Sequence, residues 1–261
     1  MSALCLYALL DAPPAGELGA GLAGEPLAVL PVAGLAVVAG EMTGRPAPSA
    51  AALAAYDAVI RRLAASAPAL LPFRFGQAVD GPAALAAALL PRAAELQAAL
   101  ARVAGCCQMT LRIFAGTDAE PSGEPASGEP EPSPAAVGPG TRYLEARRSA
   151  ERSVLTLPGV AELRAALQPL IREERLEPRV DAIRLEPRVH AARLEPGHPG
   201  RLLLSVHDLV PAAAAEEYRA RVEAARLAMT SGARVAVSGP WPPYAFGAAA
   251  VPSLSAPASP R

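Results

Sequence analysis

The sequence predicts an α+β protein with two domains, and three features of the chain lead to that prediction. Strand-like and helix-like apolar patterns occur together in each half of the 261 residues. An acidic stretch rich in Pro, Gly and Ser, residues 116–140, separates the halves. A chain of this length can form one large or two small domains. We therefore expect an N-terminal domain over residues 1–115 and a smaller C-terminal α+β domain over residues 141–247.

Short apolar runs predict the strands of the first half. Residues 3–9 are apolar throughout, which is typical of a central strand buried on both faces. Residues 35–39 and 69–75 are predicted as two further strands. In residues 107–113 apolar side chains alternate with Gln, Thr and Arg, which is the period of a half-buried strand.

Two segments of the first half have the spacing of amphipathic helices. In residues 50–66 apolar positions fall three and four residues apart, and Pro68 keeps the helix from continuing. These positions are Leu53, Tyr56, Ile60 and Leu63. Residues 82–104 repeat the spacing, but Pro91 lies in the interior and is expected to kink or split that helix.

The second half is predicted to mix helices and strands. Helices are expected over residues 141–152 and 159–174, and strands over residues 201–206 and 234–237. Between these strands, a further helix places four apolar residues on one face. They are Tyr218, Val222, Ala225 and Met229.

Three segments are predicted to lie outside the folded domains. Residues 116–140 contain only acidic charges and almost no bulky apolar residue, so they are interpreted as a solvated linker. RLEP occurs three times within residues 175–200, nine residues apart, and its prolines oppose a continuous helix. We interpret this segment as an exposed insertion, with a functional array as the alternative. Residues 248–261 are predicted to form a disordered tail.

Charge and hydropathy argue against several classes of partner. The formal net charge of −1 gives no basic field, so neither nucleic acid nor a membrane is an expected partner. The apolar stretch over residues 26–40 is shorter than a bilayer span and is interrupted by Pro31 and Gly34. No Lys or Arg precedes Arg45, so a secretory signal is not expected and we predict a cytoplasmic protein.

The residue types that carry most catalysis and metal binding are not arranged in any familiar motif. Cys5, Cys106 and Cys107 lack the spacing of a zinc site or a disulfide framework, and we expect buried thiols. His190, His198 and His207 are not expected to form a metal site, since the first two lie in the insertion. The sequence therefore predicts no metal and no cofactor.

One cluster, Ser205, His207 and Asp208, has the residue types of a hydrolytic triad. Successive residues of a strand point to opposite faces, so Asp208 is expected to point away from the other two. We therefore expect no catalytic residue here and interpret the chain as a non-enzyme.

Two segments stand out by their aromatic, Pro and Gly content. The first contains Pro72, Phe73, Arg74, Phe75 and Gly76. On a strand, its two Phe side chains would share one face and Arg74 the other, with Gly76 turning the chain. The second contains Gly239, Pro240, Trp241, Pro242, Pro243, Tyr244 and Phe246. It is expected to pack as a rigid plug over the sheet of the second domain, or alternatively to present an aromatic anchor to a partner.

These two segments carry a resemblance to a known family. LLPFRFG over residues 70–76 and SGPWPPYAF over residues 238–246 resemble the two signatures of the gas vesicle accessory family F/L (GvpF/GvpL). Further matches in the same order are Tyr7, the GxxYL segment over residues 140–144, and SV and LV over residues 205–210. The sequence departs from the family pattern at Tyr56, Gln77, Ser238 and Ala245.

The resemblance implies a fold and a function. It implies an N-terminal ferredoxin-like domain, an antiparallel sheet with helices on one face, followed by a second α+β domain. It also implies a non-catalytic accessory protein of gas vesicle formation, located in the cytoplasm and at the gas vesicle. The expected partners are the apolar shell subunit and other accessory proteins, and both signature segments are candidates for binding them. The alternatives are a ferredoxin-like sensor or enzyme for a small molecule, and a structural component of the shell.

Overall fold

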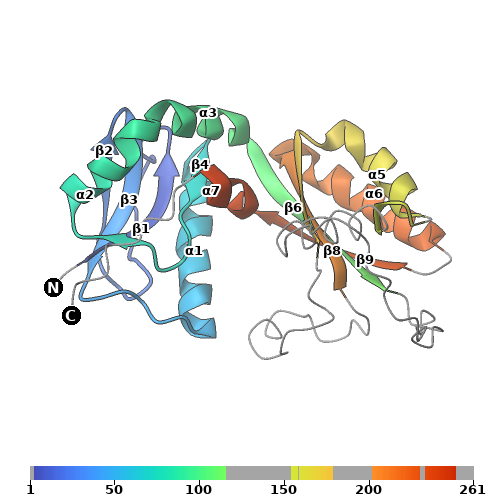
Figure 1. The fold of residues 1–261 in the computed structure, drawn as a ribbon, viewed down its shortest axis with the longest axis horizontal. Coiled ribbons are helices and arrows are strands. Elements are labelled where there is room, and N and C mark those ends of the chain that lie inside the picture. The colour runs from blue at the N-terminus through green and yellow to red at the C-terminus, as the bar shows by residue number, and fades with distance from the viewer. Residues whose placement is uncertain (1–2, 116–153, 158, 179–201, 230–232, 251–261) are drawn as a thin grey trace, which may run out of the picture. The chain divides into compact units, whose positions relative to one another are not determined.

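The computed structural model describes residues 3–115, 154–157, 159–178, 202–229 and 233–250 (Figure 1). The predicted linker, the helix expected over 141–152 and most of the RLEP insertion lie outside the described residues. The chain divides into two compact units. Unit 1 comprises Met1–Gln108, Leu209–Ala212 and Gly239–Arg261, and unit 2 comprises Met109–Asp208 and Ala213–Ser238. The α+β class and the layout in two parts agree with the sequence prediction.

Unit 1 is built on an antiparallel sheet with the strand order β2-β3-β1-β4, and β5 pairs with β1 beside β4. The strands are β1 (Ala3–Leu10), β2 (Leu27–Val32), β3 (Leu35–Met42), β4 (Leu70–Pro72) and β5 (Ala78–Val79). The helices are α1 (Ala50–Ser66), α2 (Pro82–Leu89), α3 (Ala93–Val103) and α7 (Tyr244–Ala250). The chain thus begins with three strands, which differs from the β-α-β-β-α-β order expected of a ferredoxin-like domain.

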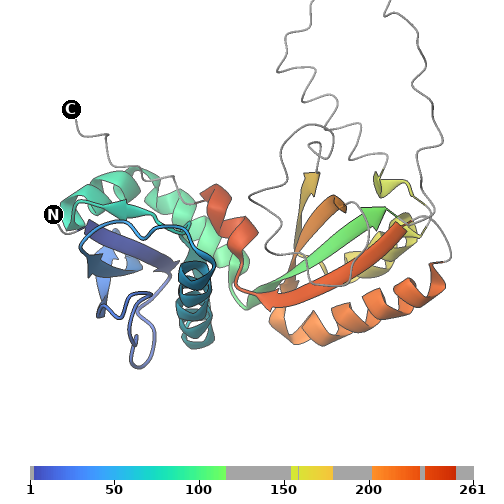
Figure 2. The ribbon, with the colours of Figure 1, turned by 90° about the horizontal axis from the view of Figure 1, so that it is seen from below.

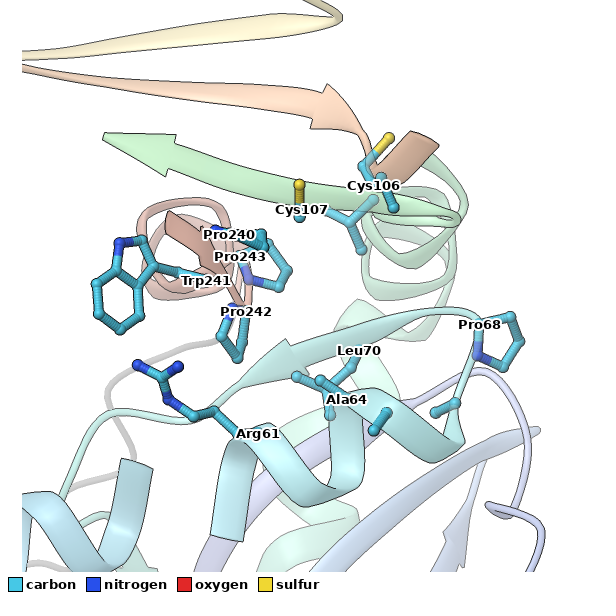
Figure 3. A pocket seen from close by; sticks show the side chains of 14 residues that line it. Arg61, Ala64, Pro68, Leu70, Cys106, Cys107, Pro240, Trp241, Pro242 and Pro243 are labelled. Carbon is cyan, nitrogen blue, oxygen red and sulfur yellow. The ribbon is translucent and has the colours of Figure 1, made fainter. Parts of the chain in front are cut away.

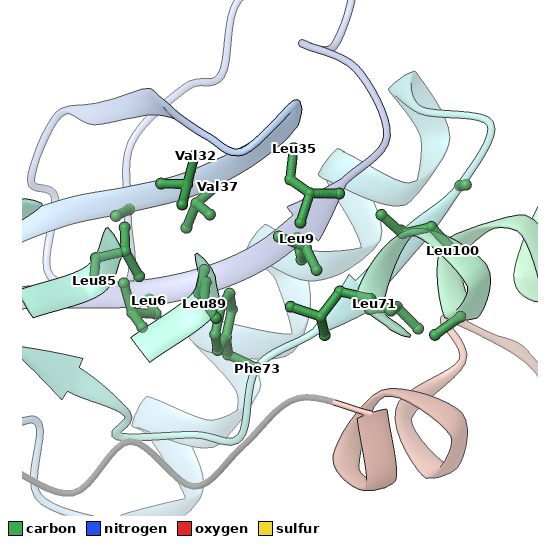
Figure 4. Close-up of a cluster of buried hydrophobic side chains, with 14 of the residues drawn as sticks. Leu6, Leu9, Val32, Leu35, Val37, Leu71, Phe73, Leu85, Leu89 and Leu100 are labelled. Carbon is green, nitrogen blue, oxygen red and sulfur yellow. The ribbon is translucent and has the colours of Figure 1, made fainter. Parts of the chain in front are cut away.

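The central strand β1 is buried on both faces, as its apolar run predicts. Leu6 and Leu9 belong to a core cluster with α2 and α3, which Figure 4 shows from close by. Tyr7 and Leu10 belong to a second cluster, formed with α1. Because both faces of β1 are apolar, both must be covered, so helices lie on the two faces of this sheet and not on one as expected.

Helix α1 and the segment that forms α2 and α3 begin and end close to where the sequence predicts, whereas α7 was not predicted. The side chain of Ser49 caps α1, its Oγ accepting a hydrogen bond from the Ala52 amide at 3.1 Å. At Pro91 the second helical segment breaks into α2 and α3, joined by the 3-10 turn Leu90–Arg92. Together Pro82–Val103 would be long and apolar enough to cross a membrane by length and composition alone. Four of its leucines, however, pack in the core of unit 1, as expected for a core helix, whereas Leu90 is exposed.

Unit 2 contains the second sheet, in the strand order β7-β8-β6-β9. The elements of this part of the chain are β6 (Cys106–Ala115), α5 (Val160–Leu167), β7 (Glu173–Pro178), β8 (Leu202–Pro211), α6 (Ala215–Ala228) and β9 (Ala233–Trp241). The start of β6 and the ends of β8 and β9, with Trp241, belong to unit 1. Figures 1 and 2 show the green strand β6 beside the orange-red strand β9. This β-α-β-β-α-β order with its central pair β8 and β6 is the ferredoxin-like arrangement. It occurs here, and not in the N-terminal part where it was expected.

Several boundaries differ from the sequence prediction, and three of them change where a predicted domain, helix or tail begins or ends. Strand β6, expected to end the first domain, pairs within the second sheet. The helix expected over residues 159–174 ends at Leu167, because Pro169 enters a 3-10 turn, and the first RLEP copy then forms part of β7. Helix α7 continues to Ala250, past residue 248 where the tail was expected to begin, and the rest of that segment lies outside the described residues.

Candidate functional site: two signature segments in one unit

The N-terminal signature, residues 70–76, begins as strand β4 and ends in a tight turn. The Gln77 amide donates a hydrogen bond to the Arg74 carbonyl at 3.1 Å, and the Gln77 side chain accepts one from the Arg74 amide at 3.1 Å. Gly76 has a φ of 77°, which a residue with a Cβ rarely adopts. Gly76 therefore turns the chain, as the sequence predicts.

This turn separates the two Phe side chains of the N-terminal signature. Phe73 belongs to the core cluster under α2 and α3, whereas Phe75 packs against the cluster under α1. The prediction that both rings share a face assumed a strand through residue 75, but β4 ends at Pro72. Arg74 is exposed, as predicted.

Tyr56 of α1 contacts the N-terminal signature through its hydroxyl and through its ring. Its hydroxyl donates a hydrogen bond to the Phe73 carbonyl at 2.8 Å. Its ring stacks on Tyr7 with centroids 5.4 Å apart and meets Phe75 edge-on at 5.6 Å. Burial raises the pKa of Tyr56 well above its ordinary value, so its hydroxyl remains a donor. The residue that departs from the family pattern thus supports the signature directly.

The C-terminal signature, residues 238–246, leaves β9 at Trp241 and enters α7 at Tyr244. The Gly239–Pro240 peptide bond is cis. Pro242 and Pro243 are buried, and the Pro243 carbonyl accepts hydrogen bonds from the Phe246 and Gly247 amides in the first turn of α7. Prolines therefore set the path of this segment up to the point where the helix begins.

From Gly239 onward, the C-terminal signature packs in unit 1. The Tyr244 hydroxyl donates a hydrogen bond to Asp57 Oδ1 at 2.6 Å, and the Ala245 amide donates one to Gln108 Oε1 at 2.8 Å. Phe246 is 3% exposed and belongs to the same core cluster as Phe73. The expected plug therefore exists, but it lies against the sheet of unit 1 and not against that of the second domain.

The close approach of the two signatures can be tested at Gly247, where α7 meets β4. A Cβ added to Gly247 would lie 2.8 Å from the Pro72 carbonyl oxygen and 3.0 Å from its ring. Backbone cannot yield as a flexible side chain can, so we expect Gly247→Ala to destabilise unit 1 by about 1–3 kcal/mol. Urea unfolding followed by tryptophan fluorescence measures this loss. Gly44→Ala is the matched control, since its Cβ would meet no atom within 4 Å, and an equal effect of both changes would contradict the packing.

A chain of polar contacts links α1 to the C-terminal signature. Asp57, which accepts the Tyr244 hydroxyl, also accepts a hydrogen bond from Arg61 Nε at 2.7 Å. The Arg61 guanidinium in turn lies 4.2 Å from the centroid of the Trp241 ring, a cation–π contact. Tyr244 and Trp241 are thus both attached to one face of α1.

A cleft of about 350 Å³ opens beside Arg61 and Trp241 (Figure 3). The end of α1, the segment that follows it, the start of β6 and the C-terminal signature form its walls. We call it the signature cleft. It is lined by Arg61, Ala64, Ala65, Ala67, Pro68, Leu70, Val103, Cys106, Cys107, Ala212, Pro240, Trp241, Pro242 and Pro243.

Sequence reasoning missed the residues that connect the two signatures. Asp57 and Arg61 lie on the polar side of an amphipathic helix, where charged residues are expected to face solvent. Gln108 alternates with apolar residues on a strand and was predicted to be exposed, yet it is buried. The only signal available was the i, i+4 spacing of Asp57 and Arg61, which predicts their ion pair but not its attachment to Tyr244.

Ser205, His207 and Asp208 do not form a triad. The Asp208 carboxylate accepts a hydrogen bond from the Tyr218 hydroxyl at 2.6 Å, on the side of α6. The His207 ring instead contacts Thr110 at 3.2 Å and Glu177 at 3.4 Å on the neighbouring strands. The predicted opposite orientation of Asp208 is confirmed. In the part of the chain that the structure describes, no group of three His, Cys, Asp or Glu could hold a metal ion.

The cysteines differ in exposure. Cys5 and Cys107 are buried, as predicted, whereas Cys106 is half-buried at the signature cleft. Burial, with a smaller contribution from Glu25, raises the pKa of the Cys5 thiol to about 11. Cys5 is therefore a protonated core residue at neutral pH and not a reactive thiolate.

Comparison with known proteins identifies the family. Residues 3–248 match the family of gas vesicle synthesis protein GvpL/GvpF. The crystal structure of gas vesicle protein GvpF from Anabaena sp. PCC7120 is similar, with a TM-score of 0.67 and 18% identity over 95% of this chain and 96% of that one. GvpF from Microcystis aeruginosa gives a TM-score of 0.65 and 17% identity over 94% and 98% of the two chains. Curated protein sequences give no significant match. The family match over nearly the whole chain, supported by the shared fold, shows that this chain belongs to the gas vesicle GvpL/GvpF family.

Proposed function

We propose that this chain acts during gas vesicle formation as a non-catalytic partner that binds the apolar shell subunit in the cytoplasm. Membership of the GvpL/GvpF family supports the gas vesicle role. A newly made apolar subunit exposes surface and strand edges that aggregate, so a protein that covers them before assembly lowers that risk. Other accessory proteins of the vesicle are further candidate partners.

Strand β2 at the edge of the unit 1 sheet supports this proposal. It ends the strand order, and in the described part of the chain it pairs only with β3. Its sequence LAVLPV carries no charge, and Ala28 is exposed while Leu27, Val29 and Leu30 are half-buried. An uncharged apolar edge of this kind is a template for a further strand. At the other edge, α7 packs against β4.

The hairpin that joins β2 to β3 shows which amides of β2 point outward. Its two loop residues, Ala33 and Gly34, have φ of 51° and 77°, which fits a two-residue turn. In such a hairpin the closing pair, Val32 and Leu35, exchanges hydrogen bonds, and alternate pairs follow. Val29 therefore directs its N–H away from β3. Pro31 agrees, since a proline in a strand needs its nitrogen on the open side.

This orientation gives a specific test of strand addition. Val29→Pro removes one outward N–H while keeping the bonds to β3, and Val29→Ala removes apolar side chain but keeps the N–H. We expect the immobilised full-length chain to capture newly translated shell subunit, Val29→Pro to lose at least about 80% of that capture, and Val29→Ala to lose much less.

Thermal midpoints of the three proteins control for folding, since a Pro that unfolds β2 would lower capture trivially. If the wild-type chain captures no shell subunit, the proposed function fails. If Val29→Pro folds and captures as well as the wild type, the shell subunit does not bind by adding a strand to β2.

A further inference from the structure

The signature cleft contains a positioned guanidinium with unused donors. Arg61 uses Nε to bind Asp57 at 2.7 Å, and its Cζ lies 4.2 Å from the centroid of the Trp241 ring. Both terminal amino groups of Arg61 lack a hydrogen-bond partner among the residues that the structure describes. Asp57 also accepts a hydrogen bond from the Tyr244 hydroxyl at 2.6 Å, so the carboxylate that binds Arg61 Nε is itself fixed in position. Two parallel donors on a fixed plane are the geometry that binds a carboxylate through both oxygens.

The walls of the cleft are mostly apolar. Ala64 and Leu70 lie on one side, and Pro242 and Pro243 lie on the other, as Figure 3 shows. Grooves lined with aromatic rings bind extended peptides, and proline side chains in such a wall lose almost no conformational entropy when they are covered. About 350 Å³ is room for two or three side chains.

We propose that the signature cleft binds an extended apolar segment of another protein that carries an Asp or Glu side chain. The carboxylate pairs with the terminal amino groups of Arg61, and the neighbouring apolar side chains of the segment fill the space between Pro242 and Ala64. Arg61 is the only charged residue among the described residues that line the cleft, and its terminal amino groups can attract a carboxylate in addition to the Nε contact with Asp57.

The solvent exposure of Arg61 favours a protein segment over a small molecule as the ligand of the cleft. The Arg61 side chain is 44% exposed, whereas sites for small molecules bury most of the ligand. A chain lying along the cleft needs only to place one carboxylate at the rim. This inference concerns a second surface, separate from β2, so it stands or falls independently of capture of the shell subunit.

Trp241 provides a built-in reporter, since it is the only Trp of the chain and lines the cleft. The probes are two acetylated and amidated peptides, Leu-Ala-Leu-Glu and Glu-Leu-Ala-Leu, each with a matched version that has Gln in place of Glu. We expect at least one Glu peptide to change the Trp emission saturably, and its Gln version to bind about three- to five-fold more weakly.

Variants of Arg61 separate the charge from the planar fork. Arg61→Gln should abolish the difference between the Glu and Gln peptides, and Arg61→Lys should restore part of it. Arg226→Gln is the control, since it makes the same charge change at an exposed Arg of unit 2. The thermal midpoint of each variant checks that the fold is retained.

Three results would overturn the proposal, and none depends on the stability of a variant alone. The first is that neither Glu peptide changes the emission of the wild-type chain saturably. The second is equal affinity of the wild type for the Glu and Gln peptides. The third is that folded Arg61→Gln keeps the preference for Glu.

Discussion

Replacing Phe246 by alanine is expected to lower the free energy of unfolding of unit 1 by about 3–5 kcal/mol. The ring is 3% exposed and lies in the core cluster that also contains Leu71 and Phe73. Removing it leaves a cavity between α7 and β4, which backbone shifts fill only in part. The effect is large because a whole aromatic ring is lost from the core of unit 1, to which Phe246 belongs although it is distant in the sequence from the strands of that unit.

The fluorescence of Trp241 during urea unfolding measures the loss of stability in unit 1. Trp241 is the only Trp of the chain and belongs to unit 1, so urea unfolding followed by its emission reports unit 1. Leu227→Ala is the control, because Leu227 is 78% exposed on α6 and should change stability by less than about 0.5 kcal/mol. A loss below about 1 kcal/mol for Phe246→Ala would show that the C-terminal signature does not complete this core.

Asp208 is expected to make unit 2 more stable at pH 5 than at pH 7. Its side chain is 1% exposed, and Oδ1 has no hydrogen-bond partner within the described residues. Burial raises the pKa of Asp208 from 3.8 to about 6, against the opposing hydrogen bond from Tyr218 and the charge of Arg164, and with a further rise from Glu174. A carboxylate that loses water without gaining full pairing favours its protonated form.

The raised pKa of Asp208 sets both the direction and the size of the pH dependence of stability. The pKa is higher in the folded state than in the unfolded state, so the stability gained by protonation is complete below about pH 4. It is lost as pH rises through about 6. A displacement of about two units corresponds to roughly 3 kcal/mol across this range.

Asp208→Asn should remove most of this dependence. The amide still offers an oxygen to the Tyr218 hydroxyl but does not titrate, so its stability should change little between pH 5 and pH 7. Far-UV circular dichroism during urea unfolding measures both units, and subtracting the transition seen by Trp241 isolates unit 2. An equal pH slope in the wild type and in Asp208→Asn would assign the dependence to other groups.

Local patterns predicted the elements whose type is determined by their own residues. Helix α1 and the split at Pro91 follow from residue spacing and from the missing N–H of proline. Strand β1 follows from its apolar run. Strand β2 was not predicted, because its run contains Pro31, which argues against an interior strand but is tolerated at an edge.

Pairings between distant segments could not be predicted in this way. The alternation in β6 shows a half-buried strand, but it does not say which sheet that strand joins. The aromatic content of the C-terminal signature indicated packing, but not that Phe246 fills the core of unit 1. Both outcomes depend on the shape of the partner surface, which no local pattern contains.

Of the candidate site, the sequence predicted only the two signature segments and not the residues that join them. Aromatic, Pro and Gly residues marked both signatures, and the resemblance to a family singled out the same segments. Tyr56, Asp57 and Arg61, which join the signatures, lie on an ordinary helix. Their role depends on contacts with distant residues: Asp57 and Tyr244, for example, are 187 positions apart in the sequence.

Vesicle formation in cells tests the central claim most directly, namely that this chain serves gas vesicle assembly by binding through the β2 edge of unit 1. Cells that carry the vesicle genes but lack this chain are supplied with the wild type, Val29→Ala or Val29→Pro at equal abundance, and the fraction of buoyant cells is counted. The account predicts that the wild type and Val29→Ala restore buoyancy, while Val29→Pro does not. Buoyancy without this chain, or full restoration by Val29→Pro, would contradict it.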